Sequence, residues 1–166
     1  MTNLQVVTWP VEKLIPYARN ARTHSAEQVA QVAASIAEFG WTNPILAGAD
    51  GIVIAGHARL LAARKLGMTE VPVIVLDHLT ESQRRALVLA DNRLALNAGW
   101  DEEMLRVEMA ALEEDGFNLE LVGFTDDEIA AVNSNHAAPE RANQVREALL
   151  AAMAGLYHIE TGGRAC

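Results

Sequence analysis

The sequence predicts an α/β fold (α+β) with a small mixed sheet of about four strands and helices packed against it. Short apolar runs rich in Val and Ile, such as residues 52–54 and 71–76, alternate with longer stretches of helical apolar spacing. Ser or Thr followed three residues later by Gln or Glu marks three helix starts. Apolar residues make up 51% of the 166 residues, which is enough for a core of ordinary size.

The first strands come from short β-type runs bounded by turn residues. Residues 4–8 predict a strand that ends at Trp9 and Pro10. The runs 45–47 and 52–55 flank a turn at 48–51 and predict a β-hairpin. Residues 71–76 predict a further strand with Pro72 near its start, where the missing N–H is tolerated.

Three helices are expected to cover this sheet, at 25–39, 57–66 and 80–97. The pairs Ser25 with Gln28 and Thr80 with Gln83 predict capping boxes at two of their starts. The glycines at 40 and 67 end the first two helices. The expected apolar positions of the second and third helices are Leu60, Leu61, Leu66, Leu87, Ala90 and Leu94, with Val88 as a further candidate.

Charge divides the chain into two parts. Residues 1–100 hold 9 Lys/Arg and 8 Asp/Glu, a net +1, whereas residues 101–166 hold 4 and 14, a net −10. We therefore expect a first domain at 1–100 and an acidic helical extension at 101–132. Residues 133–166 are expected to form a linker, a helix and a disordered tail. The acidic part argues against non-specific DNA binding through the C-terminal third.

The cysteine content and the hydropathy of the chain limit the kinds of site and the cellular location to be expected. Cys166 is the single cysteine, so a disulfide framework and a cysteine-rich metal site are excluded. No apolar run reaches signal-peptide or membrane-spanning length. A reducing cytoplasm is therefore the expected location, with no membrane partner.

The strand-to-helix junction Gly56-His57-Ala58-Arg59 is the first candidate site. Free N–H groups and a partial positive charge at a helix N-terminus attract phosphate or carboxylate. Gly56 lets the backbone approach such an anion, and Arg59 stands in the first turn, where a cation is unfavourable unless an anion is also present. The alternative is a turn glycine followed by a solvated arginine.

Two further polar groups are candidates. The loop 17–24 carries Arg19, Arg22 and His24, three side chains within six residues that can donate hydrogen bonds to an anion. A solubilising surface loop fits the same pattern. Asp91 and Asn92 form an acceptor pair of the kind that holds Mg²⁺, and the alternative is a solvated helix face.

Several spaced motifs in the same order resemble one family. They are Asn20-Ala-Arg22-Thr-His24, the helix end 36–40, the strand entry Asn43-Pro44-Ile45, Gly56-His57-Ala58-Arg59, and its continuation through 60–67 to 71–73. Together they resemble the N-terminal domain of the ParB family, in the wider ParB/sulfiredoxin superfamily, over about residues 5–100. The resemblance is greatest to the ParB-like domains that precede DNA-modification methyltransferases in phages and bacteria.

This resemblance implies a nucleotide-binding module, with CTP or ATP and Mg²⁺ as ligands, acting in DNA partition or DNA modification. The implied phosphate-binding residues are Arg22, Gly56, His57, Ala58 and Arg59. The implied metal ligands are Asp91 and Asn92. The implied partners are DNA, a DNA methyltransferase or partition partner, and a second copy of the chain in a homodimer.

A DNA-binding or nuclease domain is the main alternative, because older descriptions of the family call it nuclease-like. His57 would then be a general base or metal ligand, although no cluster of carboxylates accompanies it in sequence. The candidate DNA contacts are Arg19, Arg22, Arg64, Lys65, Arg84, Arg85 and Arg93. A small-molecule phosphotransferase is a minor alternative, since a related kinase motif has Asp where this chain has Ala55.

Three absences set limits on these implied functions. The sulfiredoxin motif has its catalytic cysteine at the position of His57, so that activity is not expected. No methyl-donor motif occurs, so the chain itself is not expected to methylate DNA. Residues after 100 show no convincing helix-turn-helix.

Overall fold

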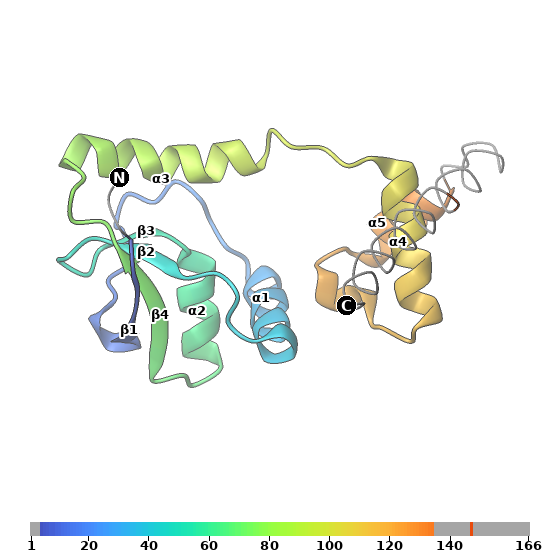
Figure 1. The fold of residues 1–166 in the computed structure, drawn as a ribbon, viewed down its shortest axis with the longest axis horizontal. Helices are drawn as coiled ribbons and strands as arrows, with labels where there is room; N and C mark the ends of the chain where they lie inside the picture. Colours follow the sequence, from blue (N-terminus) through green and yellow to red (C-terminus); the bar gives the residue numbers. More distant parts are fainter. Residues whose placement is uncertain (1–3, 135–146, 148–166) are drawn as a thin grey trace, which may run out of the picture. The chain divides into compact units, whose positions relative to one another are not determined.

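The structure is a computed structural model that describes residues 4–134 and residue 147 (Figure 1). The chain divides into two compact units, Met1–Gly99 and Trp100–Cys166. The expected linker, helix and tail over 133–166 lie almost wholly outside the described residues. None of the helices in the described ranges has the length and apolar character needed to cross a membrane.

The first unit is built on a four-stranded mixed sheet, as the sequence predicts. Its strands are β1 (Val6–Pro10), β2 (Ile45–Ala47), β3 (Val53–Ala55) and β4 (Glu70–Val75), in the order β1-β4-β2-β3. β2 and β3 form the expected antiparallel hairpin, with a register shift between Leu46 and Ala47. β4 pairs parallel with β2 and antiparallel with β1. Pro10 lies in the edge strand β1, where a missing N–H is tolerated. Pro72 is not at the start of its strand as expected: it is the third residue of β4, which lies between β1 and β2.

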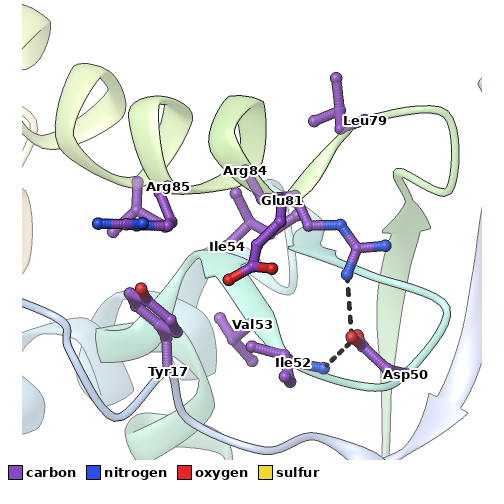
Figure 2. Close-up of a pocket in the computed structure, with 10 residues that line it drawn as sticks. Tyr17, Asp50, Ile52, Val53, Ile54, Leu79, Glu81, Arg84 and Arg85 are labelled. Atoms are coloured by element: carbon purple, nitrogen blue, oxygen red, sulfur yellow. Dashed lines mark hydrogen bonds and ion pairs between the residues drawn. The ribbon is translucent and has the colours of Figure 1, made fainter.

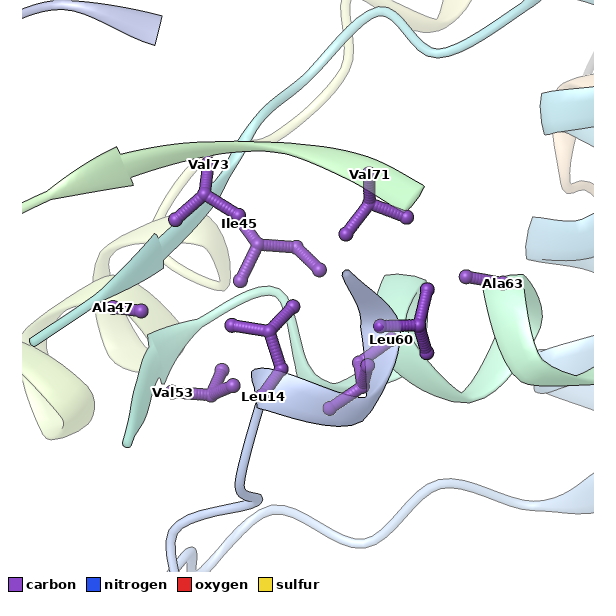
Figure 3. Packing of buried hydrophobic residues seen from close by; sticks show 9 residues of the cluster. Leu14, Ile45, Ala47, Val53, Leu60, Ala63, Val71 and Val73 are labelled. Atoms are coloured by element: carbon purple, nitrogen blue, oxygen red, sulfur yellow. The ribbon is translucent and has the colours of Figure 1, made fainter. Parts of the chain in front are cut away.

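The helix α2 (His57–Lys65) and the main core lie on one face of the sheet, and α1 (Ala26–Phe39) packs against α2. A short 3₁₀ turn, η1 (Val11–Lys13), precedes α1. Leu60 and Ala63 of α2 pack on Ile45, Val53 and other strand residues (Figure 3). These strand positions alternate in sequence with residues of the opposite face, as the two-residue period of a strand requires.

A third helix, α3 (Glu81–Ala95), covers the other face beside β3. Val88 is buried there with Ile54 and Leu76. The expected burial of Leu94 is wrong, since it is 66% exposed. α3 is about 22 Å long and β3 only about 10 Å, so the strand supports only part of the helix.

Other local expectations differ in detail. Leu61 and Leu66 are 37% and 41% exposed, so of the three leucines expected in α2's apolar face only Leu60 is buried. Thr80 and Gln83 form a complete capping box. At α1 the box is half formed: Ser25 Oγ accepts the Gln28 N–H, but Gln28 Oε1 lies 2.9 Å from His24 Nδ1 instead of returning to the cap.

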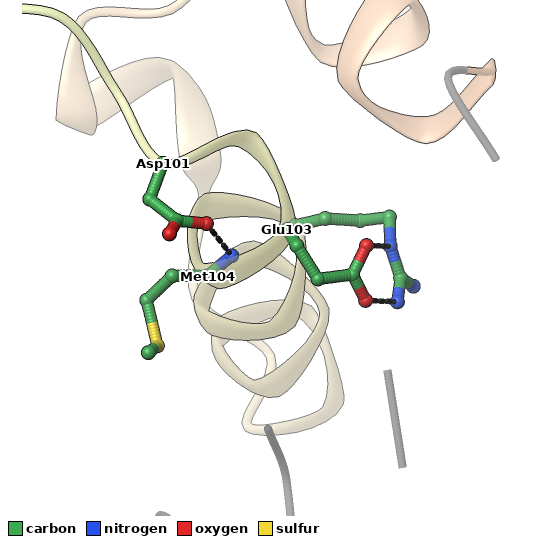
Figure 4. Close-up of polar contacts among 4 residues, drawn as sticks. Asp101, Glu103 and Met104 are labelled. Atoms are coloured by element: carbon green, nitrogen blue, oxygen red, sulfur yellow. Dashed lines mark hydrogen bonds and ion pairs between the residues drawn. The ribbon is translucent and has the colours of Figure 1, made fainter. Parts of the chain in front are cut away.

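The second unit, in its described part, is helical and acidic. It contains α4 (Glu102–Glu114), a 3₁₀ turn η2 (Leu119–Val122) and α5 (Asp126–Ser134), with Met109 and Leu119 buried. Asp101 caps α4 by accepting the Met104 N–H at 3.0 Å, and Glu103 pairs with Arg106 at 2.6 Å (Figure 4). The α5 start has the predicted reciprocal bonds between Thr125 and Glu128.

Candidate functional site

The N-terminus of α2 follows a glycine turn and has no side-chain cap among the described residues. β3 ends at Ala55 and the chain turns at Gly56, whose φ of 96° lies in the left-handed region that favours glycine. No side chain caps α2, so its first N–H groups have no side-chain acceptor. A Cβ at Gly56 would stand 3.0 Å from Arg59 Nη2, so glycine also makes room for that guanidinium.

Arg59 places an unpaired positive charge at this same helix end. It is half-buried, and its Nη1 donates to the Asn43 carbonyl oxygen at 3.0 Å. Burial lowers the pKa of Arg59, and the charge of Asp91 opposes that shift only in part. No carboxylate among the described residues forms an ion pair with it. An anion bound here would therefore be stabilised both by the arginine and by the helix N-terminus.

His57, the first residue of α2, is buried and has a backbone partner. Its side chain is 9% exposed, and its Nε2 accepts the Tyr17 N–H at 3.3 Å. An accepting Nε2 places the proton of the neutral ring on Nδ1. Burial lowers the pKa of His57 below its usual 6.5, the charge of His24 lowers it further, and Asp91 acts in the opposite direction. The neutral ring is therefore the form that the fold holds at pH 7.

The basic loop reaches the same site. A bridge between Ile15 and Ile52 pins the loop to β3, with Val53 N donating to Ile15 O at 2.9 Å. Arg22 Nη1 donates to Asn92 Oδ1 at 3.3 Å, across 70 positions of sequence. Asn20 holds the Arg22 backbone through bonds at both its N–H and its C=O.

In this cluster the carboxylate of Asp91 is the group that could bind a magnesium ion. Asn92 Nδ2 donates to Val88 O at 2.8 Å while its Oδ1 accepts from Arg22, so Asp91 is the member of the pair without a protein partner in the described residues. No group of three or more His, Cys, Asp or Glu able to hold a metal occurs among them. Mg²⁺ commonly uses one or two carboxylates together with substrate phosphates and water. The donor set thus fits a metal that arrives with a nucleotide.

The residues considered for DNA contact lie on several elements. Arg84 pairs with Asp50 at 2.9 Å, and Arg64 Nη2 donates to Leu14 O at 3.1 Å, so both support the fold. Arg22 is hydrogen-bonded to Asn92. The remaining four are exposed, and their side chains have no hydrogen bond or ion pair to another described residue: Arg19, Lys65, Arg85 and Arg93.

Sequence reasoning missed two members of the cluster, the Tyr17 N–H and the Asn43 carbonyl. Both are backbone groups, so residue type carries no signal for them. The turn at Asn43 and Pro44 is visible in the sequence, but its contact with Arg59 depends on how α2 packs beside β2.

Comparison with known proteins agrees with this architecture. The chain is 56% identical over 82 residues to the ParB-like nuclease domain-containing protein YnaK of Escherichia coli, spanning 49% of this chain and 94% of that protein. It is 35% identical over 95 residues to the chromosome-partitioning protein Spo0J of Thermus thermophilus, spanning 55% of this chain but only 35% of that protein.

A solved structure shares the fold. The C-terminally truncated chromosome-partitioning protein ParB from Caulobacter crescentus, complexed with CTP-gamma-S, superposes with a TM-score of 0.60. The match has 22% sequence identity and covers 77% of this chain and 76% of that chain.

Two families match the sequence. Residues 103–151 match the ParB-methyltransferase HTH domain, which corrects the expectation that no helix-turn-helix follows residue 100. The signal was missed because residues 101–134 hold eleven Asp/Glu and one Arg, whereas helices that read DNA are usually basic. Residues 1–93 match the ParB N-terminal domain, more than half of the chain. This protein therefore belongs to the ParB N-terminal domain family.

Proposed function

We propose that this chain binds a nucleoside triphosphate, CTP or ATP, together with Mg²⁺, as part of a protein acting in DNA partition or DNA modification. One observation carries the proposal: Arg59 is a half-buried, unpaired cation at the uncapped N-terminus of α2. A desolvated charge without a counter-ion is costly, and a bound phosphate removes that cost.

Each group of the cluster has a role in this proposal. The N–H groups of Gly56, His57 and Ala58 bind phosphate oxygens, and Arg59 neutralises them with a forked contact. Arg22 approaches from the loop, already hydrogen-bonded to Asn92. Asp91 provides the carboxylate for the metal. The Caulobacter ParB of similar fold was crystallised with a CTP analogue, which supports testing CTP first.

Calorimetry with all four nucleoside triphosphates tests the proposal. We expect heat with CTP or ATP in the presence of Mg²⁺, and a weaker signal when a chelator removes the metal. No heat with any of the four nucleotides in magnesium buffer refutes nucleotide binding.

DNA contact is the second candidate, favoured by the match of residues 103–151 to a helix-turn-helix domain. Residues 101–134 carry a net charge of −10, so phosphate contacts must come from elsewhere in the chain. The exposed cations of the first unit, including Arg19 and Lys65, are the candidates. Since the described residues contain no cluster of metal-binding carboxylates, we propose contact without cleavage.

Duplex binding followed by fluorescence anisotropy tests this second candidate. The expected affinity falls between about 50 and 200 mM salt because counterions are released from the phosphates. Absence of binding at the lower salt refutes DNA contact, and binding that does not weaken refutes the electrostatic mechanism. Size-exclusion chromatography with and without nucleotide tests the predicted homodimer, and co-purification tests a methyltransferase or partition partner.

A further inference from the structure

A pocket of about 470 Å³ lies between the first half of α3, strand β3 and Tyr17 (Figure 2). We propose that it binds a small zwitterion with an apolar side chain, that is, an apolar α-amino acid. The proposal does not depend on nucleotide binding, because none of the phosphate-site residues Gly56 to Arg59 lines the pocket.

The inner surface of the pocket is apolar. Ile52 and Ile54 contribute from β3 and the residue before it, while Leu79 and Val88 close the pocket from the α3 side. Val53 also lines the pocket, but its side chain packs in the core on the opposite face of the sheet. Ile54 and Val88 are themselves buried in one core cluster, so this surface is fixed by the core. Its volume lies in the range of small-molecule sites, which are mostly apolar with a few polar groups that orient the ligand.

Two unpaired opposite charges line the same opening. Glu81 and Arg85 are four residues apart on α3, with Glu first, which is the favourable order for an ion pair on a helix. In this structure they form no ion pair; both instead line the pocket. Figure 2 shows the Glu81 carboxylate extending from α3 toward β3. An acceptor and a donor of opposite charge are thus both available to a ligand.

Arg84 fixes the wall of the pocket next to Glu81 and Arg85. Its Nη1 pairs with Asp50 at 2.9 Å, which ties α3 to the β2–β3 turn, and Asp50 also accepts the Ile52 N–H. The Arg84 Nε is buried and has no hydrogen-bond partner among the described residues. A Cβ at Gly48 would overlap the Arg84 guanidinium, so the glycine allows this position.

The ligand class follows from this combination. A carboxylate is matched by Arg85, and an ammonium is matched by Glu81. A simple anion would meet the Glu81 carboxylate, and a simple cation would meet Arg85. A molecule that carries both charges on an apolar body satisfies every one of these groups.

The pocket also has a direct link to the cluster at α2. The Tyr17 side chain lines the pocket, while the Tyr17 N–H bonds His57. The two sites are therefore adjacent but use different atoms of the same residue.

Titrations of the full ¹⁵N-labelled chain followed by NMR test the proposal with three probes. L-Leucine carries both charges, 4-methylpentanoate lacks the ammonium, and 3-methylbutylamine lacks the carboxylate. We expect leucine to shift the amides of Ile52, Ile54 and Val88, with an affinity about tenfold above either analogue. Absence of shifts at these amides, or equal affinity for an analogue, overturns the proposal.

Matched variants assign the charges. Glu81→Gln is expected to make leucine and 4-methylpentanoate bind equally, and Arg85→Gln to make leucine and 3-methylbutylamine bind equally. Glu38→Gln, at an exposed position of α1, is expected to leave the selectivity unchanged. If Glu81→Gln and Arg85→Gln both keep the original selectivity, the two side chains do not contact the ligand and the proposal is wrong.

Discussion

Replacing Arg59 by Ala removes the charge on which the proposed phosphate site depends. The side chain makes one hydrogen bond to the protein among those the structure shows, from Nη1 to the Asn43 carbonyl. The fold should survive the change, because the buried apolar contacts of α2 come from Leu60 and Ala63. The main loss is expected in ligand affinity.

The magnitude follows from the burial of the guanidinium. Removing one partner of a desolvated charge pair costs about 2–4 kcal/mol of binding. That corresponds to a dissociation constant about 30- to 700-fold higher. Folding stability should fall by no more than about 1–3 kcal/mol, the value of one hydrogen bond from a charged donor.

The assay is nucleotide affinity and melting temperature measured on the same preparations. Lys65→Ala is the matched control, because it removes a charge from the exposed, opposite end of the same helix. The control should bind as the original chain does. If Arg59→Ala binds nucleotide with unchanged affinity while remaining folded, Arg59 does not contact phosphate and the reasoning fails.

Further predictions concern Gly56 and His57, the first two residues of the turn that leads to Arg59. His57→Gln keeps an acceptor near the Nε2 position, whereas His57→Leu removes it, so only the Leu variant should expose the loop. A lost hydrogen bond of about 1 kcal/mol should make trypsin cleavage after Arg22 about fivefold faster in the Leu variant. Since the folded-state pKa of His57 is lowered, the folded protein binds fewer protons than the unfolded chain below pH 6.5. The free energy of unfolding should therefore fall as pH drops below 6.5 and through the folded-state pKa of His57. In His57→Gln, denaturant titrations should lack this part of the pH dependence. Gly56→Ala and Gly67→Ala both strain a left-handed residue, by about 1–2 kcal/mol. Only Gly56→Ala should also lose nucleotide heat, because a Cβ at Gly67 meets nothing within 4 Å; equal calorimetric curves for the two would contradict the close approach at Gly56.

The sequence was sufficient for features that depend on neighbours along the chain. The Thr80–Gln83 box, the hairpin around 48–51 and the turn at Gly56 are all local, because caps, turns and apolar periods act within a few residues. The same local signals led to the resemblance that the family match confirms. They also fixed the acidic character of the second unit, but not its helix-turn-helix identity.

The tertiary structure decided which of these local features meet. Arg22 donates to Asn92, and His57 accepts the Tyr17 N–H, because the loop 17–24 meets both α2 and α3 in the folded unit. The bridge between Ile15 and Ile52 holds the chain just before this loop beside β3. Leu94 is exposed because the strand beneath α3 is shorter than the helix. The spacing of apolar residues within α3 carries no information about the length of that strand. Arg84 is a partner of Asp50, and the pocket beside it exists only once β3 and α3 are packed. Contacts between distant segments depend on the packing of whole elements, and the residues themselves carry no signal for that packing.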